Sequence, residues 1–186
     1  MNEDQLKKEL WIAGGLIALC VVVRLGVFEG ALPPNFAAVA SASLFAGYLL
    51  RSRAIALAVP LLSMLLADAM IGFSPVTTMI VVYTALIVPI TIGRWLRTKQ
   101  WSASTRFGAF GLSAVGASVL FFAVTNLETW FSWGLYPRTP SGLLSCYIAA
   151  LPFFKWTLAS NLVFTFGLFG MHAVAKARVP ACALPA

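Results

Sequence analysis

The stretch RSRAIALAVPLLSMLLADAMIGFSPV, residues 51–76, decides the fold. Two arginines precede a mainly apolar run at 54–73, which contains a single acid, Asp68, and is followed by a short segment ending in proline. A bilayer span needs roughly 20 apolar residues, because hydrocarbon about 30 Å thick is crossed at about 1.5 Å per residue. The run therefore predicts a transmembrane helix that begins beside two cations and ends at a tight turn.

The whole chain has the same character. Of its 186 residues, 60% are hydrophobic and 10% are charged, whereas soluble domains are about half apolar and a quarter charged. The sequence thus predicts a single all-α domain, residues 1–186, that forms a polytopic membrane protein. Six apolar runs predict a bundle of six transmembrane helices, at about 10–28, 36–50, 54–73, 76–96, 107–125 and 154–175.

Three of these elements need comment. The first run follows the mixed segment MNEDQLKKEL and lacks a small-x-small cleavage site, so we expect a retained helix and not a signal peptide. The run at 36–50 is short, and it either crosses nearly upright or begins inside the preceding loop. Apolar residues with helical spacing at about 141–152 predict a short helix on the outer surface, or else the first turns of one long, kinked final helix.

The distribution of cations predicts the orientation, since Lys and Arg near helix ends stay on the cytoplasmic side. Ten of the thirteen cations fall on one side of the predicted topology: Lys7, Lys8, Arg51, Arg53, Arg94, Arg97, Lys99, Arg106, Lys176 and Arg178. Both termini are therefore expected in the cytoplasm. The net charge of +7 is explained by this topology, so it does not indicate a nucleic-acid partner.

Two ionisable residues are placed at membrane depth, where a charge costs about 2.5–3.5 kcal/mol on insertion scales. Arg24 and Asp68 each lie about one turn from the outer end of their helix, at matching depth. They form either a structural salt bridge or the floor of a pocket that opens outward, and both can hold at once. Asn126 and Asn161 add neutral polar groups at a similar level.

The predicted outer loops carry further candidates for a small-molecule site. The motif LPPNF leaves Asn35 free to cap or bind, and the segment TNLETWFSWGLYPRTPSG, residues 125–142, is expected to form the outer loop after the fifth helix. Its aromatic residues would stack on a flat ligand or only anchor the protein at the interface. The predicted substrate-binding residues are Arg24, Asn35, Asp68, Asn126, Trp130, Tyr136, Tyr147 and Lys155.

Small residues predict close helix contacts. Ala38, Ala42 and Ala46 recur every fourth residue, and Gly14 with Ala18 forms a shorter pattern that we assign to contact with a partner helix. The three cysteines and the single histidine do not show ligand spacing, so neither a metal nor another cofactor is indicated. A nucleophile paired with a base at recognisable spacing is also missing, and an enzyme is not expected.

Several segments together carry a resemblance to known proteins. The motifs PPNFAAVASASLFAGYLL (33–50), PLLSMLLADAMIGF (60–73), TNLETWFSWGLYPRTPSGLLSCYIAALPFF (125–154) and FTFGLFG (164–170) resemble a family of small, largely uncharacterised bacterial six-helix membrane proteins. That family is more distantly similar to the S components of energy-coupling factor transporters, which capture vitamins or metal ions at the outer face.

The resemblance implies an S-component-like bundle in the bacterial cytoplasmic (inner) membrane. It also implies an outward substrate pocket and docking to a transmembrane coupling subunit, with its ATPases, through helix 1. The resulting hypothesis is a substrate-capturing subunit of an uptake transporter for a vitamin-like micronutrient. An accessory subunit of a larger membrane complex is the alternative, and an intramembrane enzyme acting on lipid is a third hypothesis that lacks a catalytic constellation.

Overall fold

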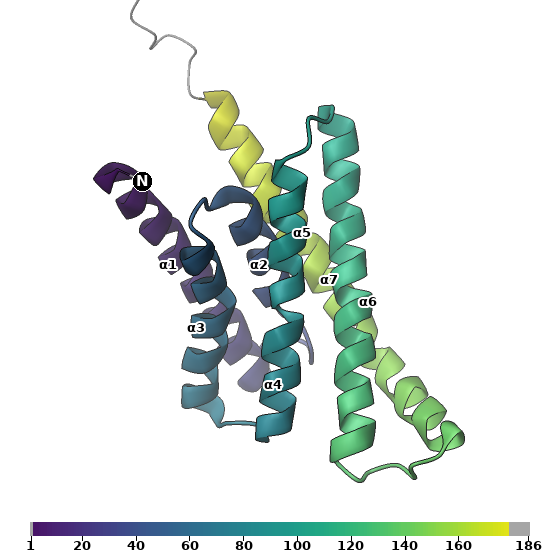
Figure 1. Ribbon diagram of the computed structural model, residues 1–186. Coiled ribbons are helices and arrows are strands. Elements are labelled where there is room, and N and C mark those ends of the chain that lie inside the picture. Colours follow the sequence, from purple (N-terminus) through teal and green to yellow (C-terminus); the bar gives the residue numbers. More distant parts are fainter. Residues whose placement is uncertain (1, 179–186) are drawn as a thin grey trace, which may run out of the picture.

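The computed structural model describes residues 2–178, which form seven helices (Figure 1). They are α1 (Glu3–Phe28), α2 (Val39–Leu49), α3 (Arg53–Ile71), α4 (Val76–Ala85), α5 (Ile87–Arg97), α6 (Ala103–Ser132) and α7 (Pro140–Arg178). Helices α4 and α5 together form one span, Val76–Arg97, and five elements are long and apolar enough to cross a membrane. The predicted fold class, an all-α polytopic membrane bundle, is confirmed.

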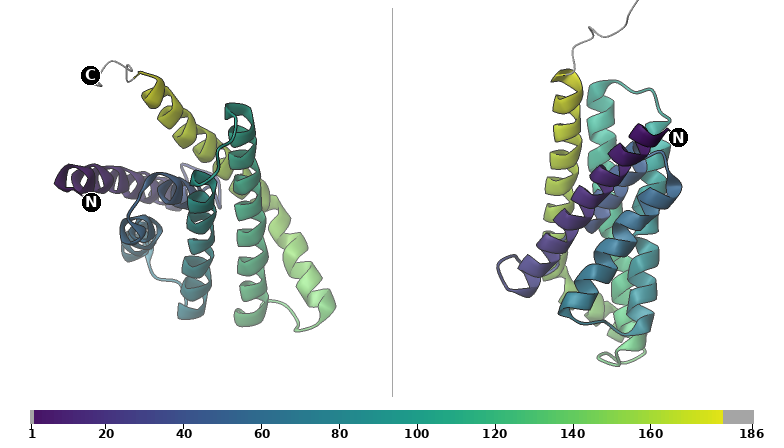
Figure 2. Two further views of the ribbon diagram at one scale, coloured as in Figure 1. Left: turned by 45° about the horizontal axis from the view of Figure 1, so that its top comes forward. Right: turned by 90° about the vertical axis from the view of Figure 1, so that its left-hand side faces the viewer.

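The chain crosses the bundle in alternating directions, so its connections fall at two ends. The start of α1, the end of α7, the α2–α3 turn and the α5–α6 loop lie at one end (Figures 1 and 2). We call it the basic end, because the ten cations that the sequence placed on one side belong to these segments. The connections α1–α2, α3–α4 and α6–α7 lie at the other end, which we call the loop end.

The outer surface of the bundle is strongly apolar. Trp11 is 83% exposed, Leu112 is 74% exposed and Val22 is 66% exposed, although each belongs to a long apolar helix. Side chains of this kind normally leave water when a soluble protein folds. Their exposure around the bundle is the expected surface of a protein whose solvent is lipid.

Helix α2 is the centre of the bundle, and most of its residues are buried. It packs against α1, α3, α5, α6 and α7. Its 11 residues span only about 17 Å at about 1.5 Å per residue, roughly half of the hydrocarbon thickness. The helix predicted at 36–50 begins three residues later, at Val39. It follows a non-helical segment that runs back into the bundle.

The contact between α2 and α5 brings two backbones together. A Cβ added to Gly47 would lie 2.2 Å from the carbonyl oxygen of Ile90, and one added to Gly93 would lie 2.1 Å from that of Leu44. Separations of that size are far below van der Waals contact. Ala42 and Ala46 of the predicted small-residue stripe are fully buried on the same helix. Small residues therefore allow α2 to pack in the interior, although the close approach to α5 is made by Gly47 and Gly93 and not by the predicted alanine stripe.

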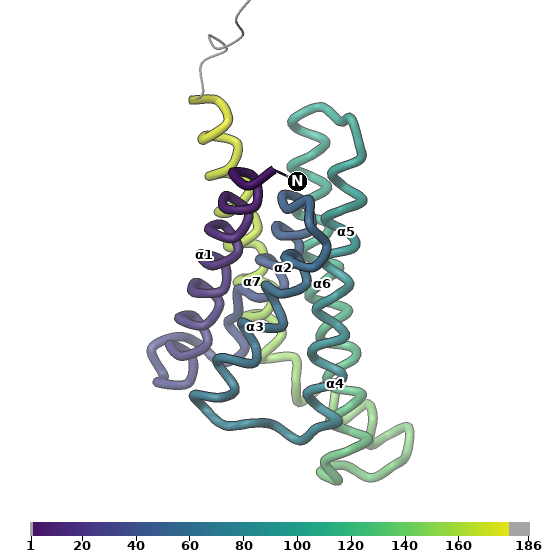
Figure 3. The backbone as a smooth tube through the Cα atoms, turned by 60° about the vertical axis from the view of Figure 1, so that its left-hand side comes forward, coloured from purple at the N-terminus to yellow at the C-terminus, as the bar shows by residue number. Residues whose placement is uncertain are grey.

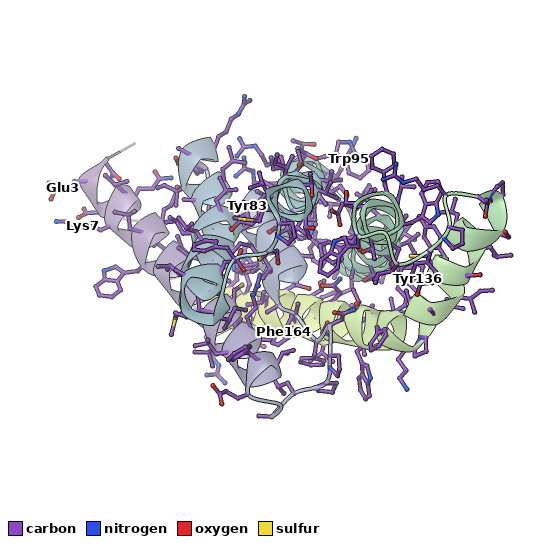
Figure 4. The ribbon with its side chains drawn as sticks, turned by 90° about the horizontal axis from the view of Figure 1, so that it is seen from below. Glu3, Lys7, Tyr83, Trp95, Tyr136 and Phe164 are labelled. Carbon is purple, nitrogen blue, oxygen red and sulfur yellow. The ribbon has the colours of Figure 1, made fainter. Side chains whose placement is uncertain are left out.

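The last two helices are longer than the sequence predicted. Helix α6 extends from Ala103 to Ser132 in place of 107–125, because residues 125–132 contain no helix breaker before Gly134. The predicted outer loop is thereby reduced to residues 133–139. Residues 141–152 are not a separate surface helix but the first turns of α7. Pro152 lies inside that helix, which changes direction between its green and yellow parts in Figure 4.

Substitution of the contact glycines tests this packing. We expect Gly47→Ala and Gly93→Ala each to lower the free energy of unfolding by ~1–3 kcal/mol, because the added methyl group collides with a backbone carbonyl. Thermal unfolding in detergent measures the effect. The matched control is Gly116→Ala on exposed α6, where an added Cβ meets nothing within 4 Å. A control variant as unstable as the other two would contradict the interpretation.

Candidate functional site

Three side chains from three helices meet near the loop end. Arg24 of α1 donates from Nη2 to Asp68 Oδ1 of α3 at 2.6 Å, and the two groups form a salt bridge. Tyr83 of α4 donates its hydroxyl to Asp68 Oδ2 at 2.8 Å. We call Arg24, Asp68 and Tyr83 the polar triad. The predicted proximity of Arg24 and Asp68 is therefore observed, and Tyr83 is an addition to it.

Each carboxylate oxygen of the triad has a donor, and the pair carries no net charge. Asp68 is 3% exposed, so its ionised form depends on these two donors in place of water. The side chain of Arg24 is 21% exposed, and its Nη1 also donates to Met64 Sδ. A guanidinium has five N–H donors, so Arg24, which lines the adjoining space, keeps donors that these two bonds do not use.

That space is a pocket of about 380 Å³. It lies among α1, α2, α3, α4, α6, α7 and the segment 29–38, and it includes residues at the loop-end termini of α1 and α3. In the backbone trace, α1 and α3 diverge from α4 and α6 toward the loop end (Figure 3). The wall is mainly apolar, with Val27, Phe28, Phe36, Met64, Ile71 and Val82 among its residues. Polar groups are contributed by the triad and by Asn35, Thr78, Thr157 and Asn161.

Segment 29–38 forms one side of the pocket and is held by hydroxyl groups of α7. The backbone N–H of Ala37 donates to Ser160 Oγ at 3.2 Å, and Thr157 Oγ1 donates to the Asn35 carbonyl at 3.4 Å. Asn35 has a φ of 61°, a left-handed conformation that Asn tolerates better than most residues. Non-helical backbone at membrane depth is stable only where protein groups bind it or it lines a cavity, and both conditions hold here.

A buried network of neutral groups lies beneath the pocket. Asn161 donates to Ser118 Oγ at 2.8 Å, and Ser41 Oγ donates to the Asn161 carbonyl at 2.9 Å. Thr165 Oγ1 lies 3.0 Å from Ser41 Oγ. These contacts join α2, α6 and α7, and the amide of Asn161 is engaged by protein groups. Asn161 therefore forms part of the pocket floor with a fixed orientation.

The structure brings three predicted binding residues, Arg24, Asn35 and Asp68, to this pocket. The other predicted residues lie elsewhere. Asn126 donates to the Phe122 carbonyl one turn back at 2.8 Å, and Tyr147 donates to the Ala123 carbonyl at 2.6 Å. These two side chains bind α6 backbone and do not line the pocket.

The remaining three predicted residues belong to the α6–α7 hairpin. Trp130 donates from its indole N–H to the Pro137 carbonyl at 2.9 Å, and so holds the loop 133–139 against α6. Tyr136 lies in that loop beside α6 and α7, whereas Tyr83 lies among the helices around the pocket (Figure 4). Lys155 is exposed and lies 5.3 Å from the ring centroid of Trp156.

Tyr83, Thr78 and Thr157 line the pocket but were not among the predicted residues. Tyr83 was detectable as a polar tip within an apolar run, but nothing in the sequence placed it opposite Asp68. Gly14 and Ala18, the predicted partner-helix residues, are exposed on α1. Within residues 2–178, no group of three His, Cys, Asp or Glu side chains is close enough to hold a metal ion.

Comparison with known proteins gives a family and no function. A family model described as a family of unknown function (DUF6580) matches residues 4–182 and so covers nearly all of the chain. Neither the curated proteins nor the solved structures contain a match.

Variants of the triad test its contribution to the stability of the bundle. We expect Asp68→Asn to cost ~3–5 kcal/mol, because it leaves Arg24 as an uncompensated charge. Tyr83→Phe removes one bond to a charged group and should cost ~1.5–3 kcal/mol.

The double variant Arg24→Met/Asp68→Leu replaces the pair by apolar groups and should recover most of the lost stability. Thermal unfolding of the purified proteins measures all three effects. A double variant as unstable as Asp68→Asn would show that the ion pair itself, and not the avoidance of an unpaired charge, stabilises the bundle.

Proposed function

The chain belongs to this family of unknown function (DUF6580), and we propose that it is the substrate-capturing membrane subunit of an uptake transporter for a small, vitamin-like molecule. The observation that carries the proposal is the pocket beside the polar triad. An apolar cavity with a few convergent polar groups is the usual form of a small-molecule site, and its volume of about 380 Å³ lies in the range of about 300–1,000 Å³ typical of such sites.

The chemistry of the wall restricts the ligand. The triad pairs one cation with one anion, so the pocket favours a neutral or zwitterionic molecule over a multiply charged one. The apolar wall would contact the body of the ligand, including by aromatic contact with Phe28 and Phe36. Spare N–H groups of Arg24 and the Asn35 amide would bind its polar substituents. These features support a mainly apolar molecule with one polar region.

Transport requires a second component in this proposal. The resemblance to S components of energy-coupling factor transporters supports a transmembrane coupling subunit with its ATPases. Gly14 and Ala18 are exposed on α1, where another helix can approach closely. The pocket is closer to the loop end, so the loop end faces outward in this scheme, and both termini lie in the cytoplasm of a bacterial cell.

Topology reporters test the orientation. We expect a fluorescent protein fused after residue 178 to fluoresce, and a periplasmic alkaline phosphatase inserted after Thr139 to be active, since the cation bias retains the basic end inside. Fluorescence and phosphatase activity are both measured in whole cells. Inactive phosphatase in the loop and a dark terminal fusion would reverse the proposed orientation.

Filling the pocket tests ligand capture. We expect gentle purification to retain a small molecule, identified by mass spectrometry, and the variant Val27→Trp to lose it at least tenfold by occupying the cavity. Val22→Trp is the matched control, because Val22 lies on the same helix but is 66% exposed on its outer surface. Equal retention by both variants would contradict the pocket as the binding site.

A second function is favoured by one observation. Both carboxylate oxygens of Asp68 already accept hydrogen bonds from protein side chains. This is expected of a triad that only holds helices together, in an accessory subunit of a larger membrane complex. In that case the purified protein carries other membrane chains and no small molecule. The stable double variant Arg24→Met/Asp68→Leu would then assemble normally, whereas a capture subunit with this change would fold and fail to bind.

A further inference from the structure

The basic end concentrates positive charge that lacks carboxylate partners. Among residues 2–178, the side-chain salt bridges are Lys7–Glu3 and Arg24–Asp68. Arg51 and Arg53 at the α2–α3 turn, and Arg94 and Arg97 at the end of α5, are therefore not ion-paired within the described chain. Cations held together on a surface repel one another and attract an anion from outside the protein.

Backbone contacts hold these cations near one another. Arg97 Nη1 donates to the Leu50 carbonyl at 2.8 Å, and Arg94 Nη1 approaches the carbonyl of the next residue, Arg51, at 3.4 Å. Two guanidinium groups are thus fixed on adjacent carbonyls of one turn. A carbonyl accepts a hydrogen bond without neutralising the charge, so each group keeps other N–H donors and its full positive charge.

One acid does approach this turn, and its oxygens are occupied. Glu9 of α1 is 5% exposed and accepts from the backbone N–H groups of Arg51 and Ser52, at 3.0 and 3.1 Å. It stabilises the start of α3, where the N–H groups of a helix favour an anion. Its single charge does not offset the four arginines.

A surface depression lies beside these groups and is lined by Tyr48, Leu49, Arg51 and Arg97. It lies at the end of the membrane spans, where the headgroups of a bilayer begin. Trp95 of the same α5 segment is 52% exposed, and the Lys99 ammonium lies 4.9 Å from its ring centroid. Exposed Trp beside Lys is typical of the boundary between hydrocarbon and headgroups.

From this geometry we propose that the α2–α3 turn and the end of α5 form a binding site for the phosphodiester headgroup of an anionic membrane lipid. The Arg51 and Arg97 side chains bind the phosphate oxygens at this depression, and Arg94 adds positive charge. Guanidinium groups match phosphate by paired N–H donors, and the acyl chains extend along the apolar surface of the bundle. The site is independent of the proposed substrate pocket, which lies toward the other end.

Native mass spectrometry of the purified protein tests the site. The protein is titrated with phosphatidylglycerol and with phosphatidylcholine of identical acyl chains, and the bound lipids are counted. We expect a clear preference for phosphatidylglycerol, which falls roughly fivefold for each cation removed and on the order of 25-fold in Arg51→Gln/Arg97→Gln. Arg51→Gln alone guards against misfolding, because the exposed Arg51 side chain makes no hydrogen bond in the described structure.

The control is Arg138→Gln/Lys155→Gln, which removes the same charge from the α6–α7 region outside the site. It should keep the preference of the original protein. Glycerol 3-phosphate in excess should not displace the lipid, whereas displacement would assign the site to a free phosphate compound. Equal binding of the two lipids, or equal loss in the site and control variants, would overturn the proposal.

Discussion

Helix α2 is too short to cross hydrocarbon, and the end that lies at membrane depth must therefore find hydrogen-bond partners inside the protein. In lipid, an unsatisfied backbone group costs several kcal/mol, so the partners determine where α2 can stand. Toward the loop end, Ser160 and Thr157 of α7 bind the preceding segment. Toward the basic end, Arg97 binds the carbonyl of Leu50, and Glu9 binds the N–H groups that follow. The other helices surround α2 because they supply these groups and because Gly47 and Gly93 let α5 approach.

Hydrophobic length and charge bias predicted the fold class, the alternation of helices and the meeting of Arg24 with Asp68, because depth along a span can be counted from its ends. The side of the helix on which a residue lies, and the neighbour that it contacts, cannot be counted in this way. Trp130 and Tyr147 have suitable depth for a pocket, but their bonds to Pro137 and Ala123 keep them in the α6–α7 hairpin. Residues 125–132 are helical although the sequence predicted a loop, because their polar side chains do not end a helix and no helix breaker occurs before Gly134.

Three buried acids show why sequence alone could not rank the polar residues. Asp68 pairs with a cation, whereas Glu9 accepts from the backbone N–H groups of the turn that precedes α3. Glu128 accepts from the hydroxyls of Thr77 and Thr78, at 3.3 and 2.8 Å, beside the start of α4. The N-cap residue of α4 is Pro75, which makes no side-chain cap bond, so an acid from α6 supplies the anion that a helix start favours. These roles depend on neighbouring helices and not on the spacing of the acids.

The polar triad connects this architecture with the pocket. Helices α3 and α4 share few contacts. The bond from Tyr83 to Asp68 is therefore a direct link between the α1–α3 pair and the α4–α6 side of the bundle. A molecule in the pocket would contact the same three side chains that set the separation of these two groups. Ligand binding and helix separation would then be coupled, because any change in the bonds of Asp68 alters the link across the pocket. A complete set of hydrogen bonds in the triad is therefore compatible with a binding role, since it fixes the cavity in an open and ordered form before a ligand enters.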